Sequence, residues 1–260
     1  DTSGKVAVKD DGTLDRASMA TITNPDDMNA VEAALAIKDM NPDVKVAVVS
    51  MGPFTAASML HECLAMGADE AVLISGREFG GSDTFATSQI IAAAIGTYGV
   101  DKDDIVFSGR QAIDGDTAQV GPQVAEKLAL PQVTCVEEIE QVAEDRLILR
   151  RRIDGGVERV EAPVPCLLTI VGGAAKCRPC NAKLVLAHKR TEPAAEGVMR
   201  QWSAADIDAD LEQCGLKGSP TKVKEVQGVA FKAKESRRLT DDETELDGLM
   251  KELIANHIIG

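Results

Sequence analysis

The sequence is short of aromatic residues and of positive charge. Phe, Trp and Tyr make up 3% of its 260 residues, and 28 basic against 42 acidic side chains give a formal net charge of −14. Proteins that hold nucleic acid use basic groups to displace counterions from phosphates, and many stack bases on aromatic rings. The composition therefore argues against a nucleic-acid partner.

Long apolar runs are also absent. No stretch approaches the roughly 18 apolar residues that mark a membrane-spanning helix. The first residues, DTSGKVAVKDD, lack the basic-then-apolar order of a secretory leader. Hydrophobic residues at 44% and charged residues at 27% are ordinary for a globular protein. We expect a protein without membrane insertion, located in the cytoplasm.

The chain has few cysteines, and they follow no disulfide-framework spacing. We interpret most of them as small buried hydrophobic residues. Cys177-Arg-Pro-Cys180 is the one C-x-x-C segment. A zinc or redox role would need a second ligand pair or a thioredoxin-like context, and the sequence shows neither. The six cysteines are Cys63, Cys135, Cys166, Cys177, Cys180 and Cys214.

Between Asn24 and about Leu130, helix-like and strand-like segments alternate. Apolar residues at helical spacing are followed by short, nearly continuous apolar runs, a pattern typical of strands covered on both faces. Repeated units of this kind indicate a doubly wound, mostly parallel sheet, with ligands beyond the carboxyl ends of the strands. The predicted helices are 29–40, 53–66, 84–97 and one ending near 130, and the predicted strands are 44–50, 70–75 and 104–108.

After residue 130 the pattern changes. The sequence predicts a strand at 133–136, a hairpin of 145–152 and 157–162, and a buried strand at 165–171, then an irregular stretch to about 200. Short helical patterns follow at 204–214 and 244–256. We predict an α/β nucleotide-binding domain over 1–200 and a C-terminal arm over 201–260 that packs on a partner subunit.

The densest candidate site is the segment Gly109–Pro122, which lies between a predicted strand and a predicted helix. Gly109 and Gly115 allow close approach of the backbone to a ligand, or a positive φ. Asp116 and Thr117 can cap the following helix, whose free N–H groups attract phosphate. This segment predicts a nucleotide site, the alternative being a surface loop with a capped helix.

The polar side chains of this segment suit the same ligand. Arg110 can neutralise a diphosphate, and Gln111 and Gln119 can hydrogen-bond to ribose or base. Asp114 and Asp116 stand two residues apart, a spacing that can bind a metal, but helix capping is the favoured role and we predict no metal site. The segment matches neither the P-loop nor G-x-G-x-x-G.

Two further segments follow predicted strands and are expected at the same sheet edge. They are Ser50–Pro53 and Gly80–Ser88. In the second, Asp83 or Thr84 can cap the helix, and Thr87 lies about one helical turn beyond Thr84. Asp83 is then a helix cap only, or Thr84 and Thr87 direct their hydroxyls at a bound cofactor.

The catalytic motifs of hydrolases are lacking. The three histidines do not accompany a G-x-S-x-G elbow, and no H-E-x-x-H occurs. No acid–base pair stands out. We predict no catalytic residue, and whether the chain is an enzyme stays open.

Several segments together resemble the beta subunit of electron-transferring flavoprotein. The resemblance covers nearly the whole chain and implies a fold of the adenine-nucleotide alpha-hydrolase-like type. It also implies a heterodimer with an alpha subunit that carries the electron-transferring FAD. The segments are Asn24–Asp27, Ser50–Pro53, Leu64–Glu70, Gly109–Pro122, Pro165–Thr169 and Gly218–Lys222.

The resemblance implies an adenine-nucleotide site in this subunit. AMP occupies it in simple members of the family, and a second FAD occupies it in electron-bifurcating members. Gly80–Ser88 resembles the bifurcating version, which favours FAD. In such members NADH delivers a hydride to this flavin, one electron goes toward a low-potential acceptor such as ferredoxin, and the other goes to the alpha-subunit FAD.

The chemistry of the strand-end segments and the resemblance together nominate one set of cofactor-binding residues. The set is Asn24, Asp26, Asp27, Met51, Gly52, Asp83, Thr84, Thr87, Ser108, Gly109, Arg110, Gln111, Asp114, Gly115, Asp116, Thr117, Ala118 and Gln119.

The resemblance also bears on partners. Family members engage acyl-CoA dehydrogenases or other flavin dehydrogenases through a Pro-Arg-Tyr-like loop with an apolar anchor. Here Cys177–Ala182 occupies that place, with Arg178 retained and Ala182 at the anchor position. Two alternatives stay open: an AMP-binding structural beta subunit, and a stand-alone adenine-nucleotide-binding protein of the stress type. The second is disfavoured because Gly218-Ser-Pro-Thr221 and the arm would then have no use.

Overall fold

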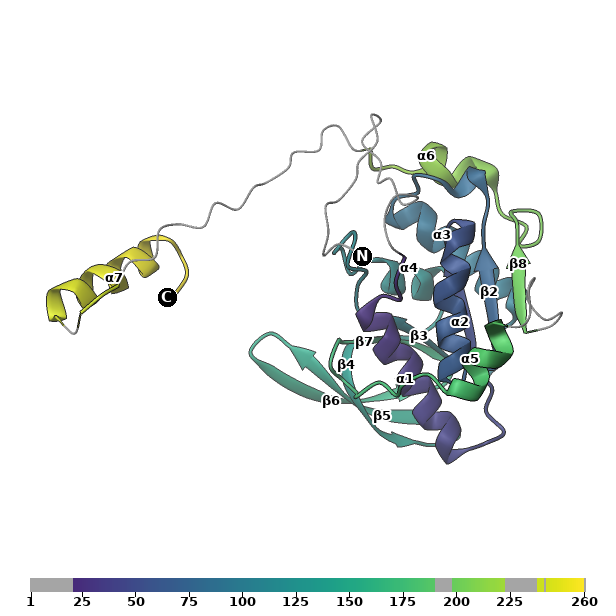
Figure 1. Ribbon diagram of the computed structural model, residues 1–260, viewed down its shortest axis with the longest axis horizontal. Coiled ribbons are helices and arrows are strands. Elements are labelled where there is room, and N and C mark those ends of the chain that lie inside the picture. Colours follow the sequence, from purple (N-terminus) through teal and green to yellow (C-terminus); the bar gives the residue numbers. More distant parts are fainter. Residues whose placement is uncertain (1–20, 190–197, 223–237, 241, 260) are drawn as a thin grey trace. The chain divides into compact units, whose positions relative to one another are not determined.

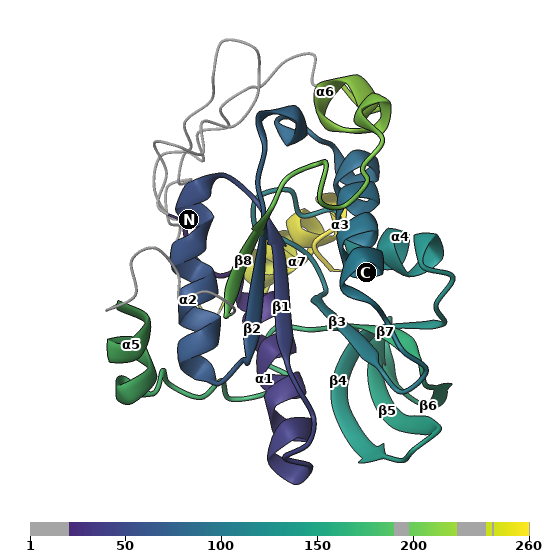
Figure 2. The same cartoon turned by 90° about the vertical axis from the view of Figure 1, so that its right-hand side faces the viewer.

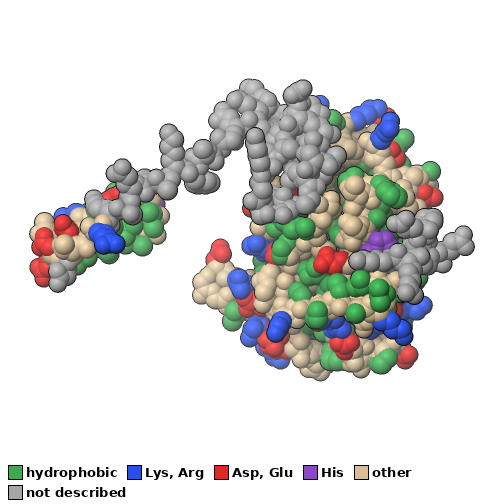
Figure 3. Space-filling model, in the orientation of Figure 1, with side chains coloured by type: hydrophobic (Ala, Val, Ile, Leu, Met, Phe, Trp, Pro, Cys, Tyr) green, Lys and Arg blue, Asp and Glu red, His purple; other side chains and the backbone are tan. Residues whose placement is uncertain are grey.

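The computed structural model describes residues 21–189, 198–222, 238–240 and 242–259, and the chain divides into two compact units, 1–224 and 225–260. The second unit contains helix α7 (Glu243–Ala255), predicted from its periodicity. Apolar side chains lie on its surface, among them Leu246, Met250 and Ile254, spaced four residues apart (Figure 3). This spacing puts them on one side of the helix.

The first unit alternates helices and strands as expected (Figure 1). Its strands are β1 (Ala47–Met51), β2 (Glu70–Ile74), β3 (Ile105–Gly109), β4 (Gln132–Val142), β5 (Arg146–Ile153), β6 (Gly156–Pro163), β7 (Cys166–Ile170) and β8 (Met199–Trp202). Its α-helices are α1 (Pro25–Met40), α2 (Ala57–Met66), α3 (Thr84–Tyr98), α4 (Val120–Lys127), α5 (Ala182–Lys189) and α6 (Gly215–Gly218), and its 3₁₀ helices are η2 (Phe54–Ala56), η3 (Arg77–Phe79) and η4 (Leu211–Gln213).

The strands form two hydrogen-bonded sheets (Figure 2). One is parallel throughout, in the order β1-β2-β8. The other has the order β3-β7-β4-β5-β6, in which β3, β7 and β4 are parallel and the last three strands form an antiparallel meander. Among the described strands, β1 and β3 each pair on one side only.

Helices cover both faces, as a doubly wound fold requires. Helices α1 and α2 share buried clusters with one set of strand residues, and α3 and α4 share clusters with the alternate set. On β7, Leu168 packs in the cluster of α1 while Leu167 packs in that of α4, because successive side chains of a strand point to opposite faces. Helix α1 also packs against both sheets, with Leu35 beside β2 and Ala30 beside β7. The predicted fold class is confirmed.

Three details differ from the prediction. Strand β4 is longer than 133–136, because its second half carries exposed Glu and Gln that hide the strand pattern. Helix α5 and strand β8 fall in the stretch predicted to be irregular. The helix predicted over 204–214 is wrong: turns and η4 occupy it, because Asp206 accepts the Ser203 N–H and Asp210 accepts the Glu212 N–H. Such side-chain bonds compete with the helix.

Residues 201–222 belong to the first unit and are bonded to it. The Trp202 backbone carbonyl accepts a hydrogen bond from the Ser75 N–H at 3.0 Å, and the hydroxyl of buried Ser219 accepts one from the Asp83 N–H at 2.8 Å. That residues 201–260 form an arm packing on a partner stays a prediction. None of the helices in the described ranges is long and apolar enough to cross a membrane.

Candidate nucleotide site

The end of β3 packs directly against the start of α1 because Gly109 has no side chain. The Gly109 N–H donates to Asp27 Oδ1 at 2.5 Å. A Cβ on Gly109 would lie 2.6 Å from the Asp27 nitrogen, closer than real contacts allow. Glycine is therefore required here by the close approach of α1, rather than by a ligand.

Asn24 holds the next part of the chain. Its Nδ2 donates to Asp27 Oδ2 and to the Gln111 carbonyl, both at 2.8 Å, and its Oδ1 accepts the Ile113 N–H at 3.1 Å. Arg110 pairs with Asp26, with 3.3 Å between Nε and Oδ2. Three residues at the start of α1, Asn24, Asp26 and Asp27, thus clamp the beginning of the 110–119 loop.

The carboxylate of Asp27 is largely shielded from water. Burial raises its pKa and the charge of Asp26 raises it further, while the N–H of Gly109 and the amide of Asn24 lower it. Both oxygens of Asp27 are engaged within the protein. Its role is therefore to shape the loop, and it offers no free oxygen to a ligand.

The rest of the loop is open to solvent. Residues 112–119 are all exposed, and a Cβ on Gly115 would meet nothing within 4 Å. Asp116 and Ala118 both have φ of +53°, an unfavourable conformation for residues other than glycine. Such strain is concentrated at functional sites. Asp114 and Thr117 complete the exposed stretch.

The predicted capping of the following helix by Asp116 or Thr117 is wrong. Helix α4 begins at Val120, its N-cap is Gln119, and no side chain caps it. Asp116 instead accepts a hydrogen bond from Gln111 Nε2 at 2.5 Å, inside the loop. The first N–H groups of α4 therefore lack a side-chain acceptor.

The polar groups of the loop before α3 form hydrogen bonds within the protein. Asp83 caps α3, accepting the Ala86 N–H at 3.0 Å, and its other oxygen accepts the Thr221 N–H at 2.8 Å. Burial raises the pKa of Asp83, but these N–H donors outweigh it, so the pKa is lowered overall. The capping interpretation of Asp83 is confirmed.

Thr84 joins the two loops. Its Oγ1 donates to Gln119 Oε1 at 2.9 Å, and one turn further on, buried Ser88 donates to Gln123 Oε1 at 2.8 Å. Thr87 is half-buried on the same helix. The structure thus brings the predicted segments before α3 and before α4 to one place.

Three predicted residues lie beside this junction without joining it. Met51 packs in the cluster beneath α3, and the Gly52 N–H donates to the Ile74 carbonyl at 3.0 Å. Within the described part of the chain, no hydrogen bond links either of them to the 110–119 loop. Ser108 packs under α4, where a Cβ on Gly121 would lie 2.6 Å from its Oγ.

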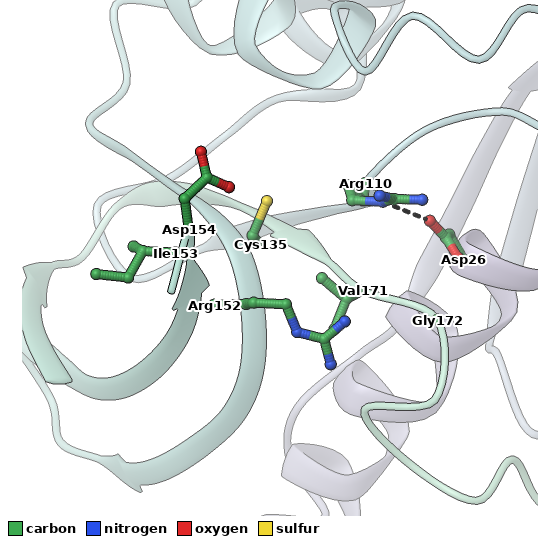
Figure 4. A pocket seen from close by; sticks show the side chains of 8 residues that line it. All are labelled: Asp26, Arg110, Cys135, Arg152, Ile153, Asp154, Val171 and Gly172. Atoms are coloured by element: carbon green, nitrogen blue, oxygen red, sulfur yellow. Dashed lines mark hydrogen bonds and ion pairs between the residues drawn. The ribbon is translucent and has the colours of Figure 1, made fainter. Parts of the chain in front are cut away.

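A cavity of about 320 Å³ opens next to the clamp (Figure 4). Arg110 and Asp26 line one side, where their ion pair is drawn as a dashed line. The other lining residues come from the two positions after β7, from the first half of β4, and from the end of β5 and the turn that follows it. The lining residues are Asp26, Arg110, Cys135, Arg152, Ile153, Asp154, Val171 and Gly172.

Comparison with known proteins settles the family. The chain matches the electron transfer flavoprotein domain over residues 11–207. The chain is a member of the electron transfer flavoprotein family. Over 213 residues it is 51% identical to the electron transfer flavoprotein subunit beta of Clostridium acetobutylicum, covering 82% of this chain and 78% of that protein.

Two other relatives carry more specific names. The acryloyl-CoA reductase electron transfer subunit gamma of Anaerotignum propionicum is 45% identical over 270 residues, covering 100% of this chain and 96% of that protein. The caffeyl-CoA reductase-Etf complex subunit CarD of Acetobacterium woodii is 48% identical over 212 residues, with 82% and 78% covered. The resemblance to a flavoprotein beta subunit is confirmed.

Sequence reasoning missed part of the cavity of this flavoprotein subunit. It named Asp26 and Arg110, but not Cys135, Arg152 or Asp154. Cys135 sits at a bulge of β4 with a φ of +59°, and the other two reach the cavity from a hairpin. No residue spacing in the sequence predicts that these side chains from separate strands line one cavity. No cluster of three metal-ligating side chains occurs in the described residues.

Proposed function

We propose that this beta subunit binds the adenosine diphosphate part of FAD between the 110–119 loop and the start of α3, in a heterodimer with a flavoprotein alpha subunit. The observation that carries the proposal is the Thr84–Gln119 hydrogen bond. It joins two loops that follow different strands, and parallel α/β proteins bind nucleotides at such edges.

The donor set of the loops suits this group. The N–H groups at the start of α4 have no side-chain acceptor, and they suit a phosphate oxygen. Arg110 supplies a guanidinium, and Gln111 and Gln119 supply amides for ribose or base. Asp27 would oppose a phosphate if its charge were free, but Gly109 and Asn24 already engage it.

The chain's own residues bind and orient the cofactor, while a bound flavin supplies the transfer of electrons. We propose NADH as the electron donor, ferredoxin as a low-potential acceptor, and an acyl-CoA dehydrogenase-type or other flavin dehydrogenase as the docking enzyme. The names of two relatives, which pair electron transfer with an acryloyl-CoA or caffeyl-CoA reductase, support a partner that acts on a CoA thioester.

The cofactor count tests the proposal. The chain is purified with its alpha subunit, flavin is measured by absorbance after denaturation, and AMP is measured by chromatography of the extract. We expect two flavins per heterodimer. One flavin and one AMP per heterodimer would reject FAD in favour of the structural nucleotide.

Substitution of the two α3 threonines tests the site itself. Thr84→Val together with Thr87→Val removes two hydroxyls, and each lost hydrogen bond costs about 1 kcal/mol, so flavin should dissociate from this site about 30-fold more readily. Thr97→Val is the control, because the Thr97 hydroxyl donates to the Ala93 carbonyl near the other end of α3. Equal flavin retention in the double variant and the control would remove Thr84 and Thr87 from the site.

A further inference from the structure

The cavity beside the clamp contains the thiol of Cys135. This residue is half-buried on β4, and its sulfur makes no hydrogen bond within the described ranges. The pairing of β4 with β7 is interrupted around Cys135, whose φ is +59°. Its N–H donates to the hydroxyl of buried Thr169 at 3.0 Å, so the sheet itself fixes this conformation. In Figure 4 the sulfur points away from β4 into the space between Asp154 and Arg110.

Two guanidinium groups that line the cavity have unused N–H groups. Arg110 donates only through its Nε, which lies 3.3 Å from Asp26 Oδ2. Arg152 uses its Nε and Nη2, which lie 2.7 Å and 2.5 Å from Glu137 Oε1. Neither the two Nη atoms of Arg110 nor Nη1 of Arg152 donate a hydrogen bond to any residue that the structure describes. Each of these three atoms can therefore donate to a carboxylate of a ligand.

Asp154 supplies the opposite chemistry. It stands at the turn after β5, it is exposed, and its carboxylate accepts no hydrogen bond in the described part of the chain. It is therefore free to bind a positive group of a ligand, whereas Asp26 and Glu137 are each bonded to an arginine. Two arginines and three carboxylates leave no excess of positive charge for a phosphate. The charges suit a zwitterion, which carries carboxylate and ammonium groups together.

We propose that the cavity binds a small zwitterionic disulfide, of the kind that glutathione disulfide represents, and that Cys135 is reversibly thiolated by it. The cavity volume of about 320 Å³ lies in the range of roughly 300 to 1,000 Å³ that is usual for small-ligand sites. Carboxylates of the bound molecule face Arg110 and Arg152, and its ammonium group faces Asp154. The site needs no bound flavin or nucleotide, so this proposal stands independently of the proposed function.

The reaction is a thiol–disulfide exchange. The Cys135 thiol loses its proton to water, and its sulfur attacks one sulfur of the small disulfide. A bond forms between these two sulfurs while the original S–S bond breaks, and the departing thiolate takes up a proton. The Cys135 sulfur is oxidised and the leaving sulfur is reduced. Attack by a second small thiol on the mixed disulfide reverses the step.

Peptide mapping of the full chain tests the proposal. The reduced protein is incubated with glutathione disulfide under native conditions, free thiols are alkylated at timed intervals, and mass spectrometry gives the modified fraction of each cysteine. We expect Cys135 to react at least about tenfold faster than Cys180, which is exposed outside the cavity, because charge-assisted contacts hold the reagent beside Cys135. With the uncharged reagent hydroxyethyl disulfide this preference should disappear. A Cys135 that stays unmodified, or the same preference with both reagents, would overturn the proposal.

Two variants separate recognition of the reagent from reactivity of the thiol. Arg152→Gln should slow the reaction of Cys135 with glutathione disulfide about tenfold and leave its reaction with hydroxyethyl disulfide unchanged. Arg159→Gln is the matched control, because Arg159 is an exposed arginine of the same hairpin, paired with Glu140, that does not line the cavity. Equal rates in the two variants would contradict the proposed binding site. Should Arg152→Gln fail to fold, the comparison of the two reagents on the wild type decides alone.

Discussion

The two loops that meet at Thr84 differ in how their polar groups are used. In the loop before α3, both oxygens of Asp83 accept backbone N–H groups, and Ser219 accepts the Asp83 N–H. In the 110–119 loop, residues 24–27 hold the first residues and Thr84 holds Gln119 at the other end. Between these ends lies an exposed stretch with two left-handed non-glycine residues, and the helix that follows has no side-chain cap.

This difference separates scaffold from binding surface. Backbone groups that are satisfied inside the protein have little left for a ligand, whereas unsatisfied donors beside a constrained backbone are available to one. We propose that the loop before α3 supports the nucleotide site and that the 110–119 loop supplies the groups that contact the nucleotide. Four substitutions test this contrast, from the largest expected effect to the smallest.

Gly109→Ala should have the largest effect. The new Cβ would lie 2.6 Å from the Asp27 nitrogen and 2.7 Å from the Asp26 carbonyl carbon, so the end of β3 and the start of α1 must separate. We expect a loss of about 3 kcal/mol in the free energy of unfolding, measured by urea denaturation. Gly115→Ala is the control, with open space around its Cβ. Equal effects in the two variants would show that the clamp is not the rigid part of the loop.

Asp27→Ala should cost about 2 kcal/mol of unfolding free energy, because the Gly109 N–H and the Asn24 amide both lose their acceptor. Asp103→Ala is the comparison, since Asp103 is exposed. Urea denaturation measures both. A cost as small as that of the control would remove Asp27 from the clamp.

Asp83→Asn should cost about 1 kcal/mol near neutral pH, since the amide group cannot accept the Thr221 N–H. The pKa of Asp83 is lowered in the folded state, so its ionised form stabilises the fold above the unfolded pKa of about 3.9. That stability disappears as the pH falls through the lower folded pKa. Unfolding curves between pH 7 and pH 2 should show the wild type and the variant converging in acid. A gap independent of pH would contradict this role.

Ala118→Gly should have the smallest effect, a gain of about 0.5 kcal/mol, because the strain at φ +53° slightly exceeds the entropic cost of glycine. Ala112→Gly, at a residue without a positive φ in the same loop, should instead lose about 0.5 kcal/mol. Calorimetric melting temperatures of the two variants should move in opposite directions. Movement in the same direction would mean that residue 118 is not strained.

Much of the first unit was predictable because its signals are local. Strands β2 and β3 are short apolar runs, and Gly67, with a φ of +132°, ends α2 where the sequence indicated. The cysteines were predicted less well. Cys63, Cys166 and Cys214 are buried as expected, but Cys180 is exposed. Burial of a single small residue depends on what packs over it, which no local pattern states.

For the site, the sequence identified the segments but not which of their polar groups are hydrogen-bonded within the protein. Glycine at 109, an acid at 83 and the polar loop between β3 and α4 are readable from residue type and spacing. Whether each of these groups is already hydrogen-bonded within the protein depends on partners far along the chain, such as Asn24 for Gln111 and Thr221 for Asp83.

By itself, the sequence determined the α/β class, the order of the elements to β3 and the segments of the flavoprotein family, because periodicity and turn residues act over a few positions. Only the tertiary structure decided that Gly109 serves α1, that Asp83 is fully engaged, that α4 is left without a side-chain cap and that Cys180 lies beside α2. Each of these depends on contacts between segments distant in sequence, and only packing sets such distances.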